Sequence, residues 1–134
     1  DIADGLQLTQ DATTISRTRI LLHDEQPVEL STSYYPAEIA ANSRLAKATK
    51  IAGGAPQALA ELGFPQRTFI DRISVRAPTP EEVETLDLPD GTPVIRQLRV
   101  IYSDNERPVE ASILIKGGHL YELLYRQALE TQSD

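Results

Sequence analysis

The sequence predicts an α+β domain built on a mainly antiparallel sheet with short flanking helices. Three observations lead to this class: two segments with the alternation and turn chemistry of a β-hairpin, a third alternating segment between them, and short helix signals in the intervening chain. The 134 residues fit one domain, and 40% hydrophobic with 25% charged residues is ordinary for a globular protein. We therefore expect one compact sheet that contains two similar hairpins.

An internal repeat relates the two hairpins. The segment from Leu6 to Glu29 aligns with the segment from Leu86 to Glu110, with one residue inserted in the second turn. Each copy opens with Leu-x-Leu and ends with Pro-Val-Glu, and Arg19 matches Arg99 between them. A general likeness of hairpins is the alternative, but it does not readily explain the shared order of the matches. We interpret the repeat as internal pseudo-symmetry.

Five strands follow from period-two alternation. The first hairpin has strands over residues 15–22 and 28–35 around a turn at 23–26, and the second has strands over 94–102 and 108–116 around a turn at 104–106. Between the hairpins, Arg67 to Arg76 alternates apolar and polar residues and predicts a further long strand.

Three short helices are predicted between the strands. Residues 37–47 have room for a short helix only, and Gly53-Gly54 breaks the chain before a helix from Pro56 towards Gly63. Thr79-Pro80-Glu81-Glu82 has the pattern of a capping box with proline at the first helical position, so a helix runs to about Leu86. Residues 120–129 fit a helix stripe slightly better than the strand alternation of Tyr121, Leu123 and Tyr125.

Composition excludes several classes of protein. The net charge of −7 and the pI near 4.8 argue against a direct grip on nucleic acid, which depends on Lys and Arg contacts with phosphate. No apolar run approaches the ~18 residues of a membrane span, and no signal peptide opens the chain. With no Cys, a cytoplasmic compartment is favoured. The chain begins at Asp1 and contains no Met, so we expect it to be part of a longer protein.

The sequence offers no catalytic, cofactor or metal motif, and we expect none of these activities. His23 and His119 stand apart from other ligating residues, and no phosphate loop, nucleophile elbow or dinucleotide fingerprint is present. Arg17 and Arg19 share one sheet face, where they either bind an anion or lie on a solvated edge. Glu110 lies on the face of Ser112 and either accepts from a ligand or pairs with an arginine.

Longer stretches of the sequence resemble a known family. TRILLHDEQPVELSTSYYPAEI, IAGGAPQALAELGF and the stretch from Arg76 to Glu110 resemble the UTRA domain, the effector-binding and dimerisation half of HutC-type regulators of the GntR family. The resemblance covers nearly the whole chain, so we expect residues 1–134 to be one such domain. It implies a chorismate-lyase-like fold with an antiparallel sheet of about six strands, in which Tyr121 to Tyr125 forms the last strand in place of a helix.

The resemblance also implies a set of effector-binding residues. Family members that bind phosphorylated sugars use an Arg-x-Arg pair and a later glutamate, which correspond here to Arg17, Arg19 and Glu110. The family's Ser and Tyr at the start of the central helix correspond to Ala55 and Gln57, and this loss of two hydroxyls puts a sugar phosphate in doubt. Further positions expected around the pocket are Tyr35, Gly54 and Arg76.

The functional expectation is a sensor domain. The resemblance implies that a polar or anionic metabolite binds between the sheet and the Gly53-Gly54 loop, that the domain is a homodimer, and that a winged helix-turn-helix domain preceding Asp1 contacts DNA. Whether the effector relieves or strengthens repression stays open. Two alternatives also stay open: an enzyme of the chorismate lyase type, because fold does not fix function, and a dimerisation domain that has lost its ligand.

Overall fold

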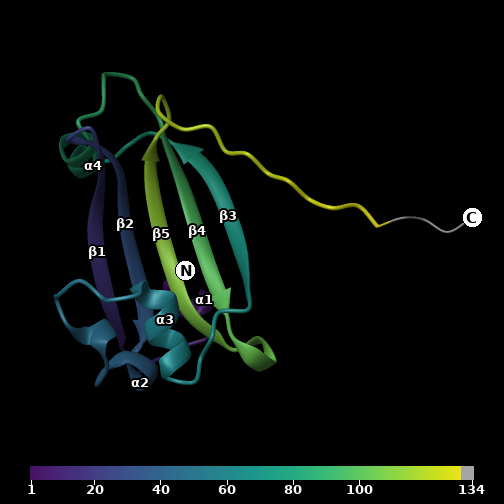
Figure 1. The fold of residues 1–134 in the computed structure, drawn as a ribbon. Coiled ribbons are helices and arrows are strands. Elements are labelled where there is room, and N and C mark those ends of the chain that lie inside the picture. Colours follow the sequence, from purple (N-terminus) through teal and green to yellow (C-terminus); the bar gives the residue numbers. More distant parts are fainter. Residues whose placement is uncertain (131–134) are drawn as a thin grey trace, which may run out of the picture.

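The computed structural model shows an α+β fold in which one antiparallel sheet carries short helices on both faces (Figure 1). The structure describes residues 1–130. The sheet has five strands in the order β1-β2-β5-β4-β3, and every neighbouring pair is antiparallel. The strands are β1 (Thr14–His23), β2 (Gln26–Pro36), β3 (Thr68–Arg76), β4 (Val94–Tyr102) and β5 (Pro108–Gly117).

The helices are all short. They are α1 (Ile2–Gly5), α2 (Ala37–Ala40), α3 (Gly54–Glu61) and α4 (Pro80–Leu86), with 3-10 turns η1 (Arg44–Ala46) and η2 (Asp104–Glu106). The predicted α+β class, the five predicted strands and the three predicted helices are confirmed. The capping box of α4 is present, because Thr79 accepts from the Glu82 amide while the Glu82 carboxylate accepts from the Thr79 amide.

The prediction of a sixth strand is wrong for residues 121–125, and so is a helix there. The amide of Gly118 donates to Pro93 and that of Leu120 donates to Gly117, which turns the chain at the end of β5. Residues 121–130 then run away from the sheet without regular structure (Figure 1). Leu124 is 90% exposed and Leu129 is 89% exposed, whereas Tyr121 at the start of the segment is half-buried beside Lys116, whose Nζ lies 5.5 Å from the centre of the ring.

The internal repeat appears in the geometry of the backbone. Both hairpins shift register at the same point, between Leu21 and Leu22 in β1 and between Ile101 and Tyr102 in β4. The left-handed backbone at Gln7, just after α1, is matched at Asp87, just after α4. The pseudo-symmetry therefore includes the irregular positions, which a general likeness of hairpins does not explain.

Alternation gives the sheet one apolar and one polar face. On the apolar face, Leu6 packs with Val100 and Ala111, and the equivalent Leu86 packs with Val94 and Ile115. The polar face is covered at one end only, where a second core holds Tyr35, Ile101, Leu45 and Leu59 beneath α2, η1 and α3. No helix within residues 1–130 is long and apolar enough to cross a membrane.

Candidate functional site

The cavity lies on the polar face of the sheet, beneath the segment that joins η1 to α3. It has a volume of about 1100 Å³. Its floor comes from β1, β2, β4 and β5, and its roof from residues 45–56. The polar residues of the floor are Ser16, Arg17, Thr18, Arg19, Ser31, Ser33, Tyr35, Arg99, Glu110 and Ser112.

Arg17 holds the roof of this cavity. Its guanidinium donates to the carbonyl oxygens of Leu45 at 3.2 Å, of Thr49 at 2.9 Å, and of Lys47. These acceptors lie in a segment where few backbone groups bond to one another. A planar fork of donors suits several carbonyls at once, so Arg17 fixes the path of the chain between η1 and α3.

Three other cations of the cavity are exposed. Arg19 comes from β1, and Lys47 and Lys50 come from the roof. None of the three forms an ion pair with a carboxylate within residues 1–130. Cationic side chains from the floor and the roof of one cavity make it attractive to an anion.

Glu110 is the acidic group of the cavity, and it is buried. Its Oε2 accepts from the Ser112 hydroxyl at 2.9 Å, and Ser112 in turn shares a 2.8 Å hydrogen bond with Ser33. Among the described residues, its Oε1 has no hydrogen-bond partner. Burial raises the pKa of Glu110, against the opposing effect of the hydrogen bond from Ser112. A buried acceptor without a partner is unfavourable unless another group donates to it.

Tyr35 lies at the covered end of the floor, beside Glu110. Burial raises the pKa of Tyr35, and the neighbouring Glu110 carboxylate raises it further. The phenol therefore stays protonated at neutral pH and offers an O–H donor next to an acceptor. This pair gives the deep end of the cavity a polar recognition point between apolar walls.

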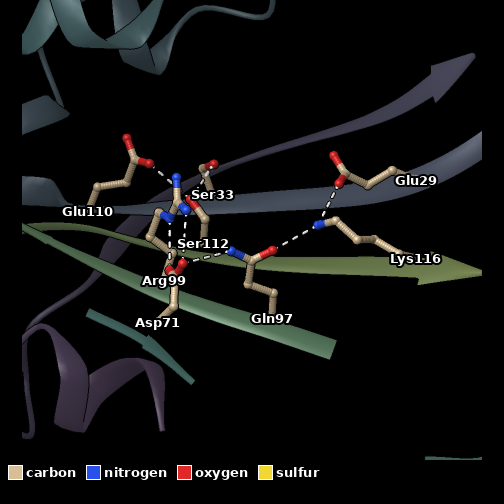
Figure 2. Close-up of polar contacts among 8 residues, drawn as sticks. All are labelled: Glu29, Ser33, Asp71, Gln97, Arg99, Glu110, Ser112 and Lys116. Atoms are coloured by element: carbon tan, nitrogen blue, oxygen red, sulfur yellow. Dashed lines mark hydrogen bonds and ion pairs between the residues drawn. The ribbon is translucent and has the colours of Figure 1, made fainter. Parts of the chain in front are cut away.

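A second polar network covers the rest of the same face (Figure 2), and within residues 1–130 none of its buried side-chain atoms lacks a hydrogen-bond partner. Arg99 donates to both oxygens of Asp71 at 2.8 and 2.9 Å, and Gln97 donates to Asp71 at 2.9 Å. Lys116 donates to Gln97 at 2.9 Å and forms an ion pair with Glu29 at 2.8 Å. The hydrogen bonds from Arg99 lower the pKa of Asp71.

Six of the eight residues expected around the effector line the cavity: Arg17, Arg19, Tyr35, Gly54, Ala55 and Glu110. Gly53 and Gly54 both have positive φ, at +79° and +80°, which explains why the roof turns at a glycine pair. This turn brings the start of α3 to the cavity.

Two expected residues lie outside the cavity. The Gln57 side chain is exposed and donates to Glu61 at 3.3 Å, because α3 continues past the cavity by that point. The Arg76 guanidinium donates to both oxygens of Glu82 at 2.7 and 2.9 Å, so it ties β3 to α4. Both residues were expected at the cavity from their positions in the sequence, which do not show where their side chains lie in the fold.

Arg99, Lys47 and Lys50 line the cavity but were not expected there. The internal repeat carried the signal for Arg99, because Arg99 is the repeat partner of Arg19 and the two lie on the same face of the sheet. Lys47 and Lys50 lie in an irregular segment that has no periodicity to indicate a face.

The chemistry of the site is that of binding. Free cations at the rim, a buried carboxylate oxygen and hydroxyl groups suit a small molecule that carries an anionic group and a hydrogen-bond donor. Residues 1–130 contain no cluster of three or more His, Asp or Glu side chains that could hold a metal ion.

Comparison with known proteins gives one family and a consistent set of relatives. The model of the UTRA domain matches residues 1–122. An HTH-type transcriptional regulator of Streptomyces coelicolor is 27% identical over 127 residues, which cover 92% of this chain and 47% of the relative. The chain therefore spans about half the length of this curated relative.

Solved structures share the fold. The effector domain of PhnF from Mycobacterium smegmatis superposes with a TM-score of 0.82 at 20% identity, covering 95% of this chain and 77% of that one. The ligand-binding domain of a GntR-family transcriptional regulator from Bordetella bronchiseptica gives 0.77 at 22% identity, covering 96% and 80%.

Proposed function

The chain belongs to the UTRA domain family, and from this premise we propose that it is the effector-binding domain of a HutC-type, GntR-family transcriptional regulator. Its relatives are transcriptional regulators, so we assign it a sensing role and no enzymatic one. The proposed regulator acts in the cytoplasm as a homodimer, and a separate N-terminal domain contacts DNA.

The observation that carries the proposal concerns residues 1–130: one oxygen of Glu110 has no hydrogen-bond partner there, and the same cavity holds cations that form no ion pair there. A ligand with a hydroxyl or ammonium group can donate to Glu110 Oε1 and remove the unfavourable state of that atom. An anionic group on the same ligand can bind Arg19, Lys47 or Lys50 at the rim. We propose a small polar or anionic metabolite with both groups as the effector.

Arg17 has a different role in this proposal from that of Arg19. Three of its N–H groups already bond to roof carbonyls, so it is a positioning residue that keeps Lys47 and Lys50 over the cavity. Arg19 forms no side-chain hydrogen bond or ion pair within the described residues, so in this proposal it is the arginine that binds the ligand. The effector changes the regulator only as far as it binds the two arrangements of the dimer with different affinity.

The test is a thermal-shift screen of polar and anionic metabolites, followed by calorimetric titration of those that bind. A ligand at about 100 times its Kd adds ~2.7 kcal/mol of stability. Arg19→Ala and Glu110→Gln should each lose most of that shift. Arg67→Ala is a matched control, because Arg67 forms an exposed pair with Asp104 away from the cavity. Unchanged binding by both cavity variants would remove this cavity from the proposal, and binding by none of the metabolites would favour a domain that only dimerises.

A further inference from the structure

We propose that β3 is the docking edge for the C-terminal segment of a second copy of this chain, so that residues 120–126 supply a sixth strand in trans. The inference names the interface of the homodimer proposed above and rests on that part of the proposed function. It starts from two features of the described chain: a strand edge with no neighbouring strand, and an extended segment that belongs to no helix or sheet.

The first feature is β3, which is the last strand of the sheet and pairs only with β4. Its outer edge presents backbone N–H and C=O groups without strand partners. Large apolar side chains are exposed on both faces of the strand, with Phe69 at 55%, Ile70 at 57% and Val75 at 65%. Edge strands of monomers are usually shortened, whereas this one is nine residues long, and four of those residues have large apolar side chains.

The second feature is the segment that follows β5. Tyr121, Leu123 and Tyr125 alternate as a strand would, yet the segment forms no regular structure in its own chain. Residues 124–130 are exposed, and Figure 1 shows the segment leaving the sheet on the side of β3. A strand-like segment with exposed apolar side chains and unpaired backbone groups fits the edge of another sheet.

One antiparallel register brings together a pair of opposite charges and three apolar pairs, with Leu123 opposite Asp71, whose carboxylate is already bonded to Arg99 and Gln97. It places Glu122 opposite Arg72, and neither side chain forms an ion pair within residues 1–130. Opposite charges and apolar pairs directly across from each other stabilise antiparallel strands. The same register pairs Tyr121 with Ile73, Leu124 with Ile70 and Tyr125 with Phe69.

The geometry of the sheet prevents this register within one chain. Gly117, Val94 and Arg76 lie in one row across β5, β4 and β3. A residue opposite Ile73 lies three strands across and three residues down from Gly117, which is about 17 Å. The residues from Gly118 to Tyr121 span at most about 14 Å when fully extended. Tyr121 therefore cannot reach its place on its own β3.

Other pairings at the edge of β3 do not combine the charge pair with the apolar pairs. Registers shifted by two or four residues, which bring the segment within reach of its own β3, place Leu124 or Arg126 opposite Arg72. Two β3 strands paired over their full length around a twofold axis place Arg72 opposite Arg72, and like charges directly opposite are unfavourable. Exchange of the segment between two copies keeps the charge pair and the apolar pairs together.

Disulfide trapping tests the inference directly, because the full chain contains no Cys. Ile70→Cys and Leu124→Cys chains are prepared separately, mixed and oxidised. Directly opposite Cβ atoms in a strand pair lie close enough for a disulfide. We expect the mixture to give a disulfide-linked heterodimer at least ten times more abundantly than a control mixture of Ile20→Cys with Leu124→Cys, since Ile20 is exposed on β1 at the other edge of the sheet.

Equal or weaker trapping than the control overturns the inference, as does an intramolecular disulfide in a chain that carries both Ile70→Cys and Leu124→Cys. Sedimentation of the unmodified chain tests the homodimer separately from the interface at β3. A dimer that is not trapped at β3 overturns this interface alone, whereas a monomer at all concentrations overturns the homodimer as well.

Charge reversal gives a second measurement that does not depend on thiol chemistry. Exchange of the segment makes two such pairs in the dimer, so Arg72→Glu and Glu122→Arg should each weaken it by up to about 25-fold, which is about five-fold for each cross-strand charge pair. The chain with both substitutions should regain most of the affinity of the unmodified chain. Equal weakening by the double variant and the singles would show that the two side chains do not pair.

Discussion

Glu29 and Glu110 occupy equivalent positions in the two hairpins, yet the protein treats their charges in opposite ways. Both follow Pro-Val, both sit at the register shift of their hairpin, and both are buried on the polar face. Lys116 neutralises Glu29 at 2.8 Å, whereas Glu110 keeps an oxygen without a partner within the described chain. Figure 2 shows the two carboxylates at opposite ends of the polar face.

The difference comes from one pair of residues. In the register of the repeat, the counterpart of Lys116 is Tyr35. At one end of the sheet a lysine therefore meets the glutamate, and at the other end a tyrosine does. A phenol can donate a hydrogen bond but cannot cancel a charge. The end with Glu29 and Lys116 therefore stabilises the fold, and the end with Glu110 and Tyr35 is the one that we propose binds a ligand.

Lys116→Met breaks the satisfied end and should have the largest effect. It leaves Glu29 as a buried charge without a counter-ion, because both side chains are only 8% exposed. We expect a loss of about 3–5 kcal/mol in the free energy of unfolding. Chemical denaturation measures it.

Replacement of both charges gives the matched control. The chain with Glu29→Leu and Lys116→Met should regain most of that stability, since an apolar pair needs no counter-ion. A double variant as unstable as the single one would mean that packing of the Lys116 stem, and not the stranded charge, causes the loss.

Asp71→Asn weakens the middle of the satisfied network. The hydrogen bonds from Arg99 hold the pKa of Asp71 below its usual range, so the folded state stabilises the carboxylate. We expect a loss of about 1.5–3 kcal/mol at neutral pH, the range for hydrogen bonds to charged groups. This stability is present above the unfolded pKa of about 3.9 and is lost as the pH falls through the lower folded pKa. Stability curves of the two proteins should converge in acid, and parallel curves would assign the loss to another cause.

Most of the fold was predictable because alternation and turn chemistry are local signals. The strands and the α4 capping box follow from residues that are close in the sequence, and the face shared by Glu110 and Ser112 follows from period two. The absence of a sixth strand at residues 121–125 was not predictable. The alternation of side chains there is typical of a strand, but it does not show whether a neighbouring strand of the same chain lies within reach.

The site was less predictable because it depends on strand register and on irregular segments. Asp71, Arg99 and Ser112 form one row across three strands, and only the pairing of those strands brings them together. Arg17 was expected to face the ligand, but its acceptors lie about thirty residues away in an irregular segment. No pattern near Arg17 indicates that its guanidinium binds backbone carbonyls.

Arg17→Ala should separate the roof from the floor of the cavity. Loss of three hydrogen bonds from a half-buried guanidinium to the roof carbonyls should destabilise the protein by about 1–2 kcal/mol. Amide hydrogen exchange should accelerate in residues 45–53 and stay unchanged in β4 and β5. Arg19→Ala is the control, because its exposed side chain bonds to no roof carbonyl among the described residues, so exchange there should not change. Equal exchange in the two variants would refute the positioning role.

Glu110→Gln should give the smallest change in the free energy of unfolding, and it should stabilise the protein where the other substitutions destabilise it. Burial raises the pKa of Glu110, so its charged form is disfavoured in the folded protein. A carboxyl whose folded pKa is raised makes stability fall as the pH rises from the unfolded pKa of about 4.3 through the folded pKa. The variant lacks this fall and should be about 1 kcal/mol more stable than the unmodified chain at neutral pH without ligand. Thermal unfolding across that pH range measures it.

The corresponding Glu29→Gln should instead lose stability, because it removes the counter-ion of Lys116. A stabilised Glu29→Gln chain, or a destabilised Glu110→Gln chain, would show that the two ends of the sheet do not differ as their partners indicate.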